Sequence, residues 1–171
     1  MVMSRMLKLS VIILSLVVLL VGCGGQKTLV GKPAPDFQFG GPDEQPVSLS
    51  DFQGSPVLLN FWATWCGPCV HEMPYLQQVW DEWQARGLVL LAINIMESSS
   101  AVQSFMQSQG LSFPVLLDGD GAIAAKYGIE GIPTTFFIDG EGIIQQVQVG
   151  AFPNAAAIEN SLLKLTGMPS D

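Results

Sequence analysis

The chain has 171 residues, of which 49% are hydrophobic, which is enough for one compact domain with a substantial core. Charged residues make up only 13%, and the balance is acidic, with 15 Asp and Glu against 7 Lys and Arg. A chain of this charge is repelled by nucleic acid and by anionic lipid surfaces, so nucleic-acid binding is excluded.

The first 22 residues predict a secretory signal peptide rather than a part of the fold. Arg5 and Lys8 supply positive charge, and residues 9–21 are apolar apart from two serines. At roughly 1.5 Å per helical residue, this apolar stretch is too short for the ~30 Å hydrocarbon core of a bilayer. A charged segment followed by a short apolar segment is the pattern of a signal peptide.

The residues that end the apolar stretch, Leu20-Val21-Gly22-Cys23, resemble the bacterial lipobox. The resemblance implies cleavage before Cys23, a diacylated Cys23 as the new N-terminus, and residues 23–30 as a tether. Two acyl chains give stable anchoring where one is marginal. We therefore expect a lipid-anchored protein of the bacterial cell envelope, on the outer side of the cytoplasmic membrane or at the periplasmic side of the outer membrane. An uncleaved signal anchor, with Cys23 as a bystander, is the alternative.

The mature chain predicts strands that alternate with helices. Residues 36–50 are rich in turn formers and include a short edge strand at 46–49. The nearly continuous apolar runs at 56–62 and 88–95 are typical of buried strands. The other expected elements are helices at 66–86, 98–109, 122–127 and 154–166 and strands at 113–117, 134–138 and 143–149. This order predicts one α/β domain over residues 31–168, with a central mixed sheet flanked by helices on both faces.

The helix expected at 66–86 has the clearest pattern. Its apolar residues recur at spacings of three and four, which makes one buried face. Gly87 is a natural stop. Pro74 lies inside the helix, where it removes a backbone donor and should kink the axis.

The chain has three cysteines, and two of them, Cys66 and Cys69, form one Cys-x-x-Cys pair when the lipidated Cys23 is set aside. A zinc site would need two more ligands, and the chain has one histidine. Attachment of c-type haem needs a histidine directly after the second cysteine, where this chain has Val70. We therefore expect no metal and no cofactor.

The spacing of Cys66 and Cys69 is typical of a redox-active dithiol at the start of a helix. Unpaired backbone N–H groups and the helix dipole favour a thiolate on Cys66, and the thiolate is the species that attacks disulfides. Cys69 lies one turn inside the helix and suits the resolving role. We predict that Cys66 forms a mixed disulfide with a partner and that Cys69 then releases the reduced partner.

Residues 61–69, Phe-Trp-Ala-Thr-Trp-Cys-Gly-Pro-Cys, closely resemble thioredoxin-like proteins, and residues 131–137 resemble their cis-proline loop. Pro74, five residues after the second cysteine, matches their helix-kinking proline. The resemblance extends over about residues 31–168. It implies a thioredoxin-like fold with an N-terminal β extension.

The same resemblance implies the residues that meet a substrate. Pro133 is expected to be a cis-proline that faces the dithiol, and the backbone of Ile132 is expected to pair with an extended substrate segment. Trp65, Gly67 and Pro68 are expected to contact the partner as well.

One departure from cytosolic thioredoxin concerns proton transfer. Asn60 stands where thioredoxin has a buried Asp, six residues before the first cysteine, and it cannot titrate. Glu72, three residues after Cys69, resembles the glutamate of the membrane-tethered TlpA/ResA subgroup. If burial raises its pKa, Glu72 can accept the proton of Cys69; a solvated surface glutamate is the alternative. Asn60 is interpreted as structural and His71 as a surface residue.

The leading prediction is a thiol–disulfide oxidoreductase that reduces disulfides of exported proteins, such as apocytochrome c. The Gly-Pro dipeptide matches reducing thioredoxins, at about −270 mV, rather than the oxidant DsbA, at about −120 mV. The resemblance implies a membrane thiol electron donor of the DsbD or CcdA type. Two alternatives stay open. One is a peroxidase, because residues 33–37 also resemble the opening of peroxiredoxins, although Ala63 stands where those have a threonine. The other is a redox-gated binding module.

Overall fold

The computed structural model describes residues 29–39 and 47–167. The expected signal peptide and Cys23 lie outside these residues. Within the described ranges, no helix is both long and apolar enough to cross a membrane.

Strands and helices follow one another in the predicted order, with small differences at their ends. The elements are β1 (Gln38–Phe39), β2 (Val47–Ser48), η3 (Leu49–Phe52), β3 (Val57–Trp62), α2 (Gly67–Trp83), η4 (Gln84–Arg86), β4 (Val89–Ile95), α3 (Ser99–Gln109), β5 (Val115–Asp118), α4 (Ala122–Lys126), β6 (Thr134–Ile138), β7 (Ile144–Val149) and α5 (Ala155–Thr166). The last turn of the expected helix at 66–86 tightens into the 3₁₀ turn η4, which ends at Gly87 with a φ of 89°. The strand expected from residue 113 begins at Val115, where pairing with β4 starts.

The central sheet has five strands in the order β5-β4-β3-β6-β7. β3, β4 and β5 run parallel, whereas β6 is antiparallel to β3 and β7 is antiparallel to β6. The carboxyl ends of β3, β4, β5 and β7 and the start of β6 therefore meet at one end of the sheet. We call it the dithiol end, because Cys66 follows β3 there.

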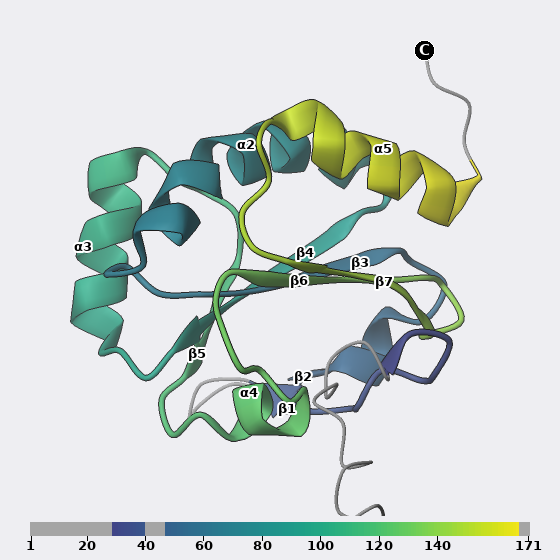
Figure 1. Ribbon diagram of the computed structural model, residues 1–171, viewed down its shortest axis with the longest axis horizontal. Helices are drawn as coiled ribbons and strands as arrows, with labels where there is room; N and C mark the ends of the chain where they lie inside the picture. Colours follow the sequence, from purple (N-terminus) through teal and green to yellow (C-terminus); the bar gives the residue numbers. More distant parts are fainter. Residues whose placement is uncertain (1–28, 40–46, 168–171) are drawn as a thin grey trace, which may run out of the picture.

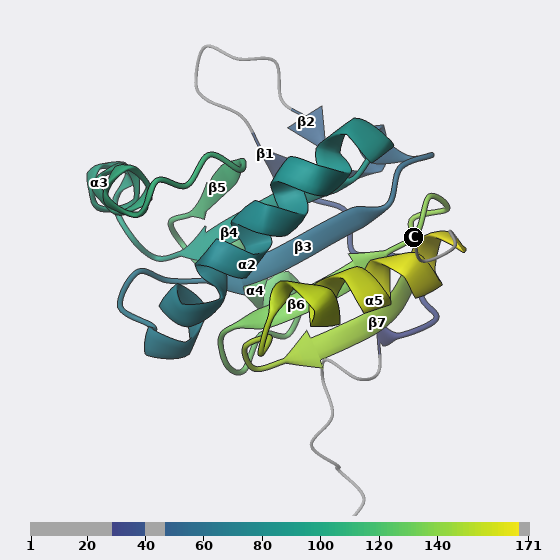
Figure 2. The ribbon, with the colours of Figure 1, turned by 90° about the horizontal axis from the view of Figure 1, so that it is seen from above.

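Helices cover both faces of this mixed sheet, as predicted. α2 and α5 lie on one face, and α4 lies on the other with β1, β2 and η3 (Figures 1 and 2). α3 lies beside the β5 edge and contributes Val102 to the core beneath α2. Its Phe105 ring lies 5.4 Å from the ring of Trp62, measured between centroids.

The N-terminal β extension is a separate two-stranded antiparallel sheet of β1 and β2. The sequence pattern predicts β2 as an edge strand but gives no sign of β1. Asp36 holds the segment together, because its carboxylate accepts hydrogen bonds from Phe37 N, Ser50 N and Ser50 Oγ. The hydroxyl of Tyr127 donates to Pro35 O at 2.9 Å and ties the extension to the end of α4.

Two cores lie on opposite faces of the sheet. Successive side chains of β3 point to opposite faces, so Leu58 and Trp62 enter the core under α2, whereas Leu59 and Phe61 enter the core over α4. Every residue of β3 is buried. This explains why the strand reads as a continuous apolar run with Asn60 as its one polar member.

Candidate active site

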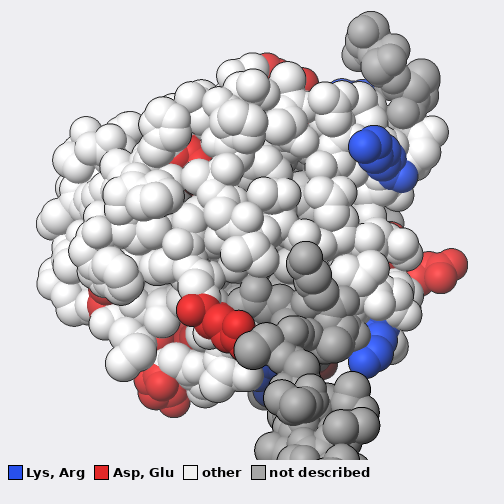
Figure 3. Space-filling view, in the orientation of Figure 1, with Lys and Arg blue, Asp and Glu red and all other residues white. Residues whose placement is uncertain are grey.

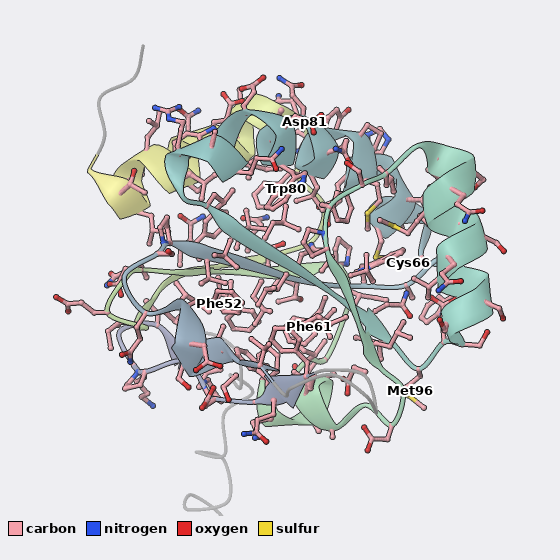
Figure 4. All side chains as sticks on the ribbon, turned by 180° about the vertical axis from the view of Figure 1, so that it is seen from behind. Phe52, Phe61, Cys66, Trp80, Asp81 and Met96 are labelled. Carbon is pink, nitrogen blue, oxygen red and sulfur yellow. A yellow bond between two sulfur atoms is a disulfide. The ribbon has the colours of Figure 1, made fainter. Side chains whose placement is uncertain are left out.

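Cys66 and Cys69 are joined as a disulfide at the start of α2, with their Cα atoms 5.2 Å apart. Cys66 is the N-cap residue of the helix, and its Sγ accepts a hydrogen bond from Cys69 N at 3.2 Å. Cys66 retains 6% exposure and Cys69 retains none, so only the first sulfur can be reached from outside. Figure 4 shows Cys66 where the strands end and α2 begins.

The predicted proline loop lies directly against this disulfide. The peptide bond between Ile132 and Pro133 is cis, and Ile132 O lies 3.7 Å from Cys66 Sγ. Two hydrogen bonds fix the loop: Thr134 Oγ1 donates to Gly131 O at 2.7 Å, and Gly150 N donates to Pro133 O at 2.8 Å. The structure therefore brings together Ile132, Pro133 and Cys66.

The remaining predicted contact residues form the outer surface around Cys66. Gly67 and Pro68 are exposed, and the side chain of Trp65 is 71% exposed. Trp62, three residues earlier, is fully buried. The two tryptophans of the motif thus divide between surface and core.

Glu72 is completely buried, on the same side of α2 as Cys69 and one turn further along. Its Oε1 accepts from Asn60 Nδ2 and its Oε2 from Phe152 N, each at 2.9 Å. Burial raises the pKa of Glu72 to about 7, and the hydrogen bonds from Phe152 and then Asn60 offset part of that rise. The carboxyl group therefore exchanges its proton near neutral pH.

Asn60 has a closer connection to the site than the sequence predicts. Its Nδ2 donates to Glu72 and also to Thr135 Oγ1 at 2.9 Å, while its buried Oδ1 has no hydrogen-bond partner. The residue interpreted as structural therefore contacts the titrating carboxyl group. The alternation along β3 is the signal that could have indicated this, because it places Asn60 on the face that α2 covers.

A second carboxylate, missed by sequence reasoning, fixes the loop before Cys66. Glu97 Oε2 accepts from Thr64 N at 2.7 Å and from Asn94 Nδ2 at 2.8 Å, and its Oε1 accepts from Thr64 Oγ1. Partial burial raises the pKa of Glu97, but the hydrogen bonds from Thr64 and Asn94 outweigh it and hold that pKa below its usual range. We call these three residues, Thr64, Asn94 and Glu97, the carboxylate clamp.

A further feature is the placement of the His, Cys, Asp and Glu side chains. Among residues 29–39 and 47–167, no group of three or more His, Cys, Asp and Glu side chains is placed to hold an ion. His71 is exposed and lies edge-on to the ring of Tyr75.

The chain is similar to known proteins in sequence. The sequence model of the AhpC/TSA family matches residues 30–147. Thiol-disulfide oxidoreductase ResA of Bacillus subtilis is 38% identical over 130 residues, which cover 76% of this chain and 73% of that protein. ResA of Oceanobacillus iheyensis is 40% identical over 126 residues, which cover 71% and 66%.

Two solved structures are also similar. A putative thiol:disulfide interchange protein DsbE from Chlorobium tepidum has a TM-score of 0.72 and 35% identity, with 80% of this chain and 96% of that chain covered. StoA from Bacillus subtilis has a TM-score of 0.64 and 27% identity, with 76% and 97% covered.

Proposed function

This chain belongs to the AhpC/TSA family and is a thiol–disulfide oxidoreductase of thioredoxin-like fold, and we propose that it reduces disulfides of exported proteins such as apocytochrome c. The observation that carries the proposal is the dithiol at the start of α2, with one reachable sulfur beside the loop of Ile132 and Pro133. Gly67 and Pro68 between the cysteines support the reducing direction, since this dipeptide occurs in thioredoxin at about −270 mV.

In this mechanism the reduced protein gives two electrons to the substrate. The Cys66 thiolate attacks the substrate disulfide, which forms a mixed disulfide and releases one substrate thiolate. Cys69 then attacks Cys66 Sγ, which restores the Cys66–Cys69 disulfide and releases the second substrate sulfur as a thiolate, and both substrate thiolates take up protons from solvent. A membrane thiol donor of the DsbD or CcdA type must afterwards return two electrons to the protein.

Exposure and hydrogen bonding support this division of roles. Cys69 N already donates to Cys66 Sγ, and the same donor would hold a negative charge on that sulfur after reduction. Cys69 is fully covered, so it meets only the sulfur beside it. The exposed Trp65, Gly67 and Pro68 would contact the substrate protein.

Glu72 is the proton acceptor in this proposal. Cys69 must lose its proton before it can attack the mixed disulfide, and an ionised Glu72 on the same side of α2 can take it up. Because the pKa of Glu72 is about 7, the acceptor form becomes dominant as pH rises through neutrality. The resolving step should accelerate over the same pH range.

Attachment to a membrane is a further part of the proposal. Residues 1–22 would be removed as a signal peptide, Cys23 would carry the lipid, residues 23–30 would form the tether, and residues 31–168 would be the catalytic domain. Mass spectrometry of the protein purified from membranes should then find Cys23 as the N-terminal residue, carrying two acyl chains. An uncleaved N-terminus or an unmodified Cys23 would contradict lipid anchoring at Cys23.

A trapping experiment tests the function directly. In Cys69→Ser the resolving sulfur is gone, so Cys66 should accumulate mixed disulfides with envelope proteins, which mass spectrometry can identify. The double variant Cys66→Ser/Cys69→Ser is the control and should trap nothing. If Cys69→Ser traps no protein either, a redox-gated binding module is favoured. A reduction midpoint above about −180 mV, the value for protein disulfide isomerase, would contradict the reducing direction.

A further inference from the structure

We propose that Met96 selects substrates at the dithiol end and favours proteins with apolar residues beside the target disulfide. The inference rests on the proposed function. It concerns which substrates are accepted rather than how the sulfurs exchange.

The carboxylate clamp fixes the position of Met96 relative to the dithiol. Trp62 in β3 pairs with Asn94 in β4, so the segments that follow these two parallel strands leave the sheet side by side at the dithiol end. Glu97, the neighbour of Met96, accepts two hydrogen bonds from Thr64, which lies two residues before Cys66. The loop that holds the reachable cysteine and the loop that holds Met96 are therefore joined.

The backbone of Met96 has an unfavourable conformation, and packing of its side chain does not compensate for it. Its φ is 57°, in the left-handed region, and it is the one non-glycine residue with positive φ in the described ranges. The side chain is nevertheless 70% exposed, so it gains little from packing within the chain. An exposed apolar side chain held in such a conformation, in a loop that is joined to the loop of the reachable cysteine, is a candidate for recognition.

Most of the exposed apolar side chains lie at the dithiol end of the sheet. Among the described residues, the large apolar side chains that are exposed are Val30, Trp65, Met96, Leu117 and Val149. All except Val30 lie at the dithiol end, in or just after the last residues of β3, β4, β5 and β7. Val30 precedes Gly31, whose N–H donates to Ile144 O at the opposite end of β7.

Basic side chains have the opposite distribution. The Lys and Arg of the described residues are Lys32, Arg86, Lys126 and Lys164. Lys32 O accepts from Ile144 N, and Arg86 precedes the start of β4, so both lie away from the dithiol end. In Figure 3, the side of the molecule where α3 lies shows no blue. Lys126 Nζ donates to Asp36 O in the N-terminal extension, and Lys164 lies in the last turn of α5. An acidic substrate segment would therefore find no Lys or Arg beside Cys66 among the described residues.

The carboxylate of Glu97 in the carboxylate clamp does not favour a basic partner either. The carboxylate of Glu97 already accepts three hydrogen bonds from Thr64 and Asn94, and these stabilise its negative charge without a basic partner. A typical protein contact covers about 800 Å² on each partner, which is a disc of roughly 16 Å radius. A contact of that size centred on Cys66 has room for both Trp65 and the loop of Met96. The complementary substrate surface is therefore apolar.

Peptide substrates test the inference. We would prepare three peptides of equal length, each closed by one disulfide and flanked by Leu, Lys or Asp. The full chain is reduced beforehand, so that oxidation of its two thiols to the disulfide supplies the two electrons for each peptide. Rates are divided by the rate of the same protein with hydroxyethyl disulfide, a small uncharged disulfide. The unaltered protein should reduce the Leu peptide at least about fivefold faster than the Lys or Asp peptide, the size expected for one good apolar contact.

Met96→Gly removes the side chain and also relieves the left-handed backbone, because glycine adopts positive φ readily. This variant should lose most of the preference for the Leu peptide while its melting temperature stays the same or rises. Val30→Gly, at the opposite end, is the matched control and should keep the full preference.

The outcomes separate the two proposals. Equal rates of the unaltered protein with all three peptides, or an undiminished preference in Met96→Gly, would overturn the role of Met96. If the unaltered protein reduces hydroxyethyl disulfide but none of the peptides, the proposed protein-disulfide reductase function itself fails.

Discussion

The two faces of the central sheet differ in what they bury. On the α4 face, Phe61 lies among aromatic rings, with the ring of Tyr127 at 5.4 Å and that of Phe136 at 5.9 Å between centroids. On the α2 face, the core includes the disulfide and borders the polar pair of Asn60 and Glu72. Figure 4 shows Phe61 and Trp80 on opposite sides of the sheet. Since Asn60 and Phe61 are neighbours in β3, adjacent residues of one strand face the buried carboxyl group and the aromatic core separately.

The largest expected effect comes from the aromatic face. Phe61→Ala should lower the free energy of unfolding by about 3–5 kcal/mol, because it removes a fully buried ring and leaves a cavity. The rate of the remaining folded protein with a small disulfide should not change. Urea unfolding and stopped-flow kinetics measure the two quantities. A slower reaction per folded molecule would show that the two faces are not independent.

The next effect is the pH dependence introduced by Glu72. Its pKa rises from 4.5 to about 7 on folding, so the folded protein holds a proton that the unfolded chain releases. This stabilisation is complete below pH 4.5 and is lost as pH rises through 7. Relative to Glu72→Gln, the protein should lose on the order of 3 kcal/mol of unfolding free energy between pH 4.5 and 8.

Unfolding of both proteins by urea at several pH values checks that prediction. Glu97→Gln is a useful comparison, because the pKa of Glu97 is lowered, so its contribution to stability should stay nearly constant above pH 4.5 and be lost only as pH falls below that value. A difference between the protein and Glu72→Gln that stays constant from pH 4.5 to 8 would contradict the elevated pKa.

The smallest expected effect separates Asn60 from Glu72. Asn60→Ala removes a hydrogen bond that lowers the pKa of Glu72, so that pKa should rise by about one pH unit. The midpoint of the pH–rate profile should move upward with it. Thr135→Val is the control, since it contacts Asn60 but leaves the bond to Glu72 in place. An unchanged midpoint in Asn60→Ala would assign Asn60 a purely structural role.

Features encoded by short stretches of sequence could be predicted. The continuous apolar run of β3, the three-and-four spacing in α2 and the motif around Cys66 and Cys69 each lie within one element or one turn. The cis bond before Pro133, which the resemblance to thioredoxin-like proteins implies, is present, and Trp65, expected to contact a partner, is exposed. Local pattern and resemblance were sufficient for these because each depends on neighbours along the chain.

Contacts between distant elements could not be predicted in the same way. Glu72 meets Asn60 across 12 residues and Phe152 across 80, and Glu97 meets Thr64 across 33. Such pairs depend on how α2 lies on β3 and on how the loops of Thr64 and Glu97 follow neighbouring strands. Neither arrangement produces a periodic pattern in the sequence. β1 was missed for a related reason, since two residues are too few to show alternation.

The amide of Phe152 gives the molecule an internal reporter of charge. This N–H lies just before α5 and donates to the carboxyl oxygen of Glu72. A bond to an ionised oxygen is stronger than a bond to a protonated one, so the exchange of this hydrogen with solvent should slow when Glu72 loses its proton. Hydrogen exchange at one backbone position can therefore follow the protonation of a buried side chain without any substitution in the protein.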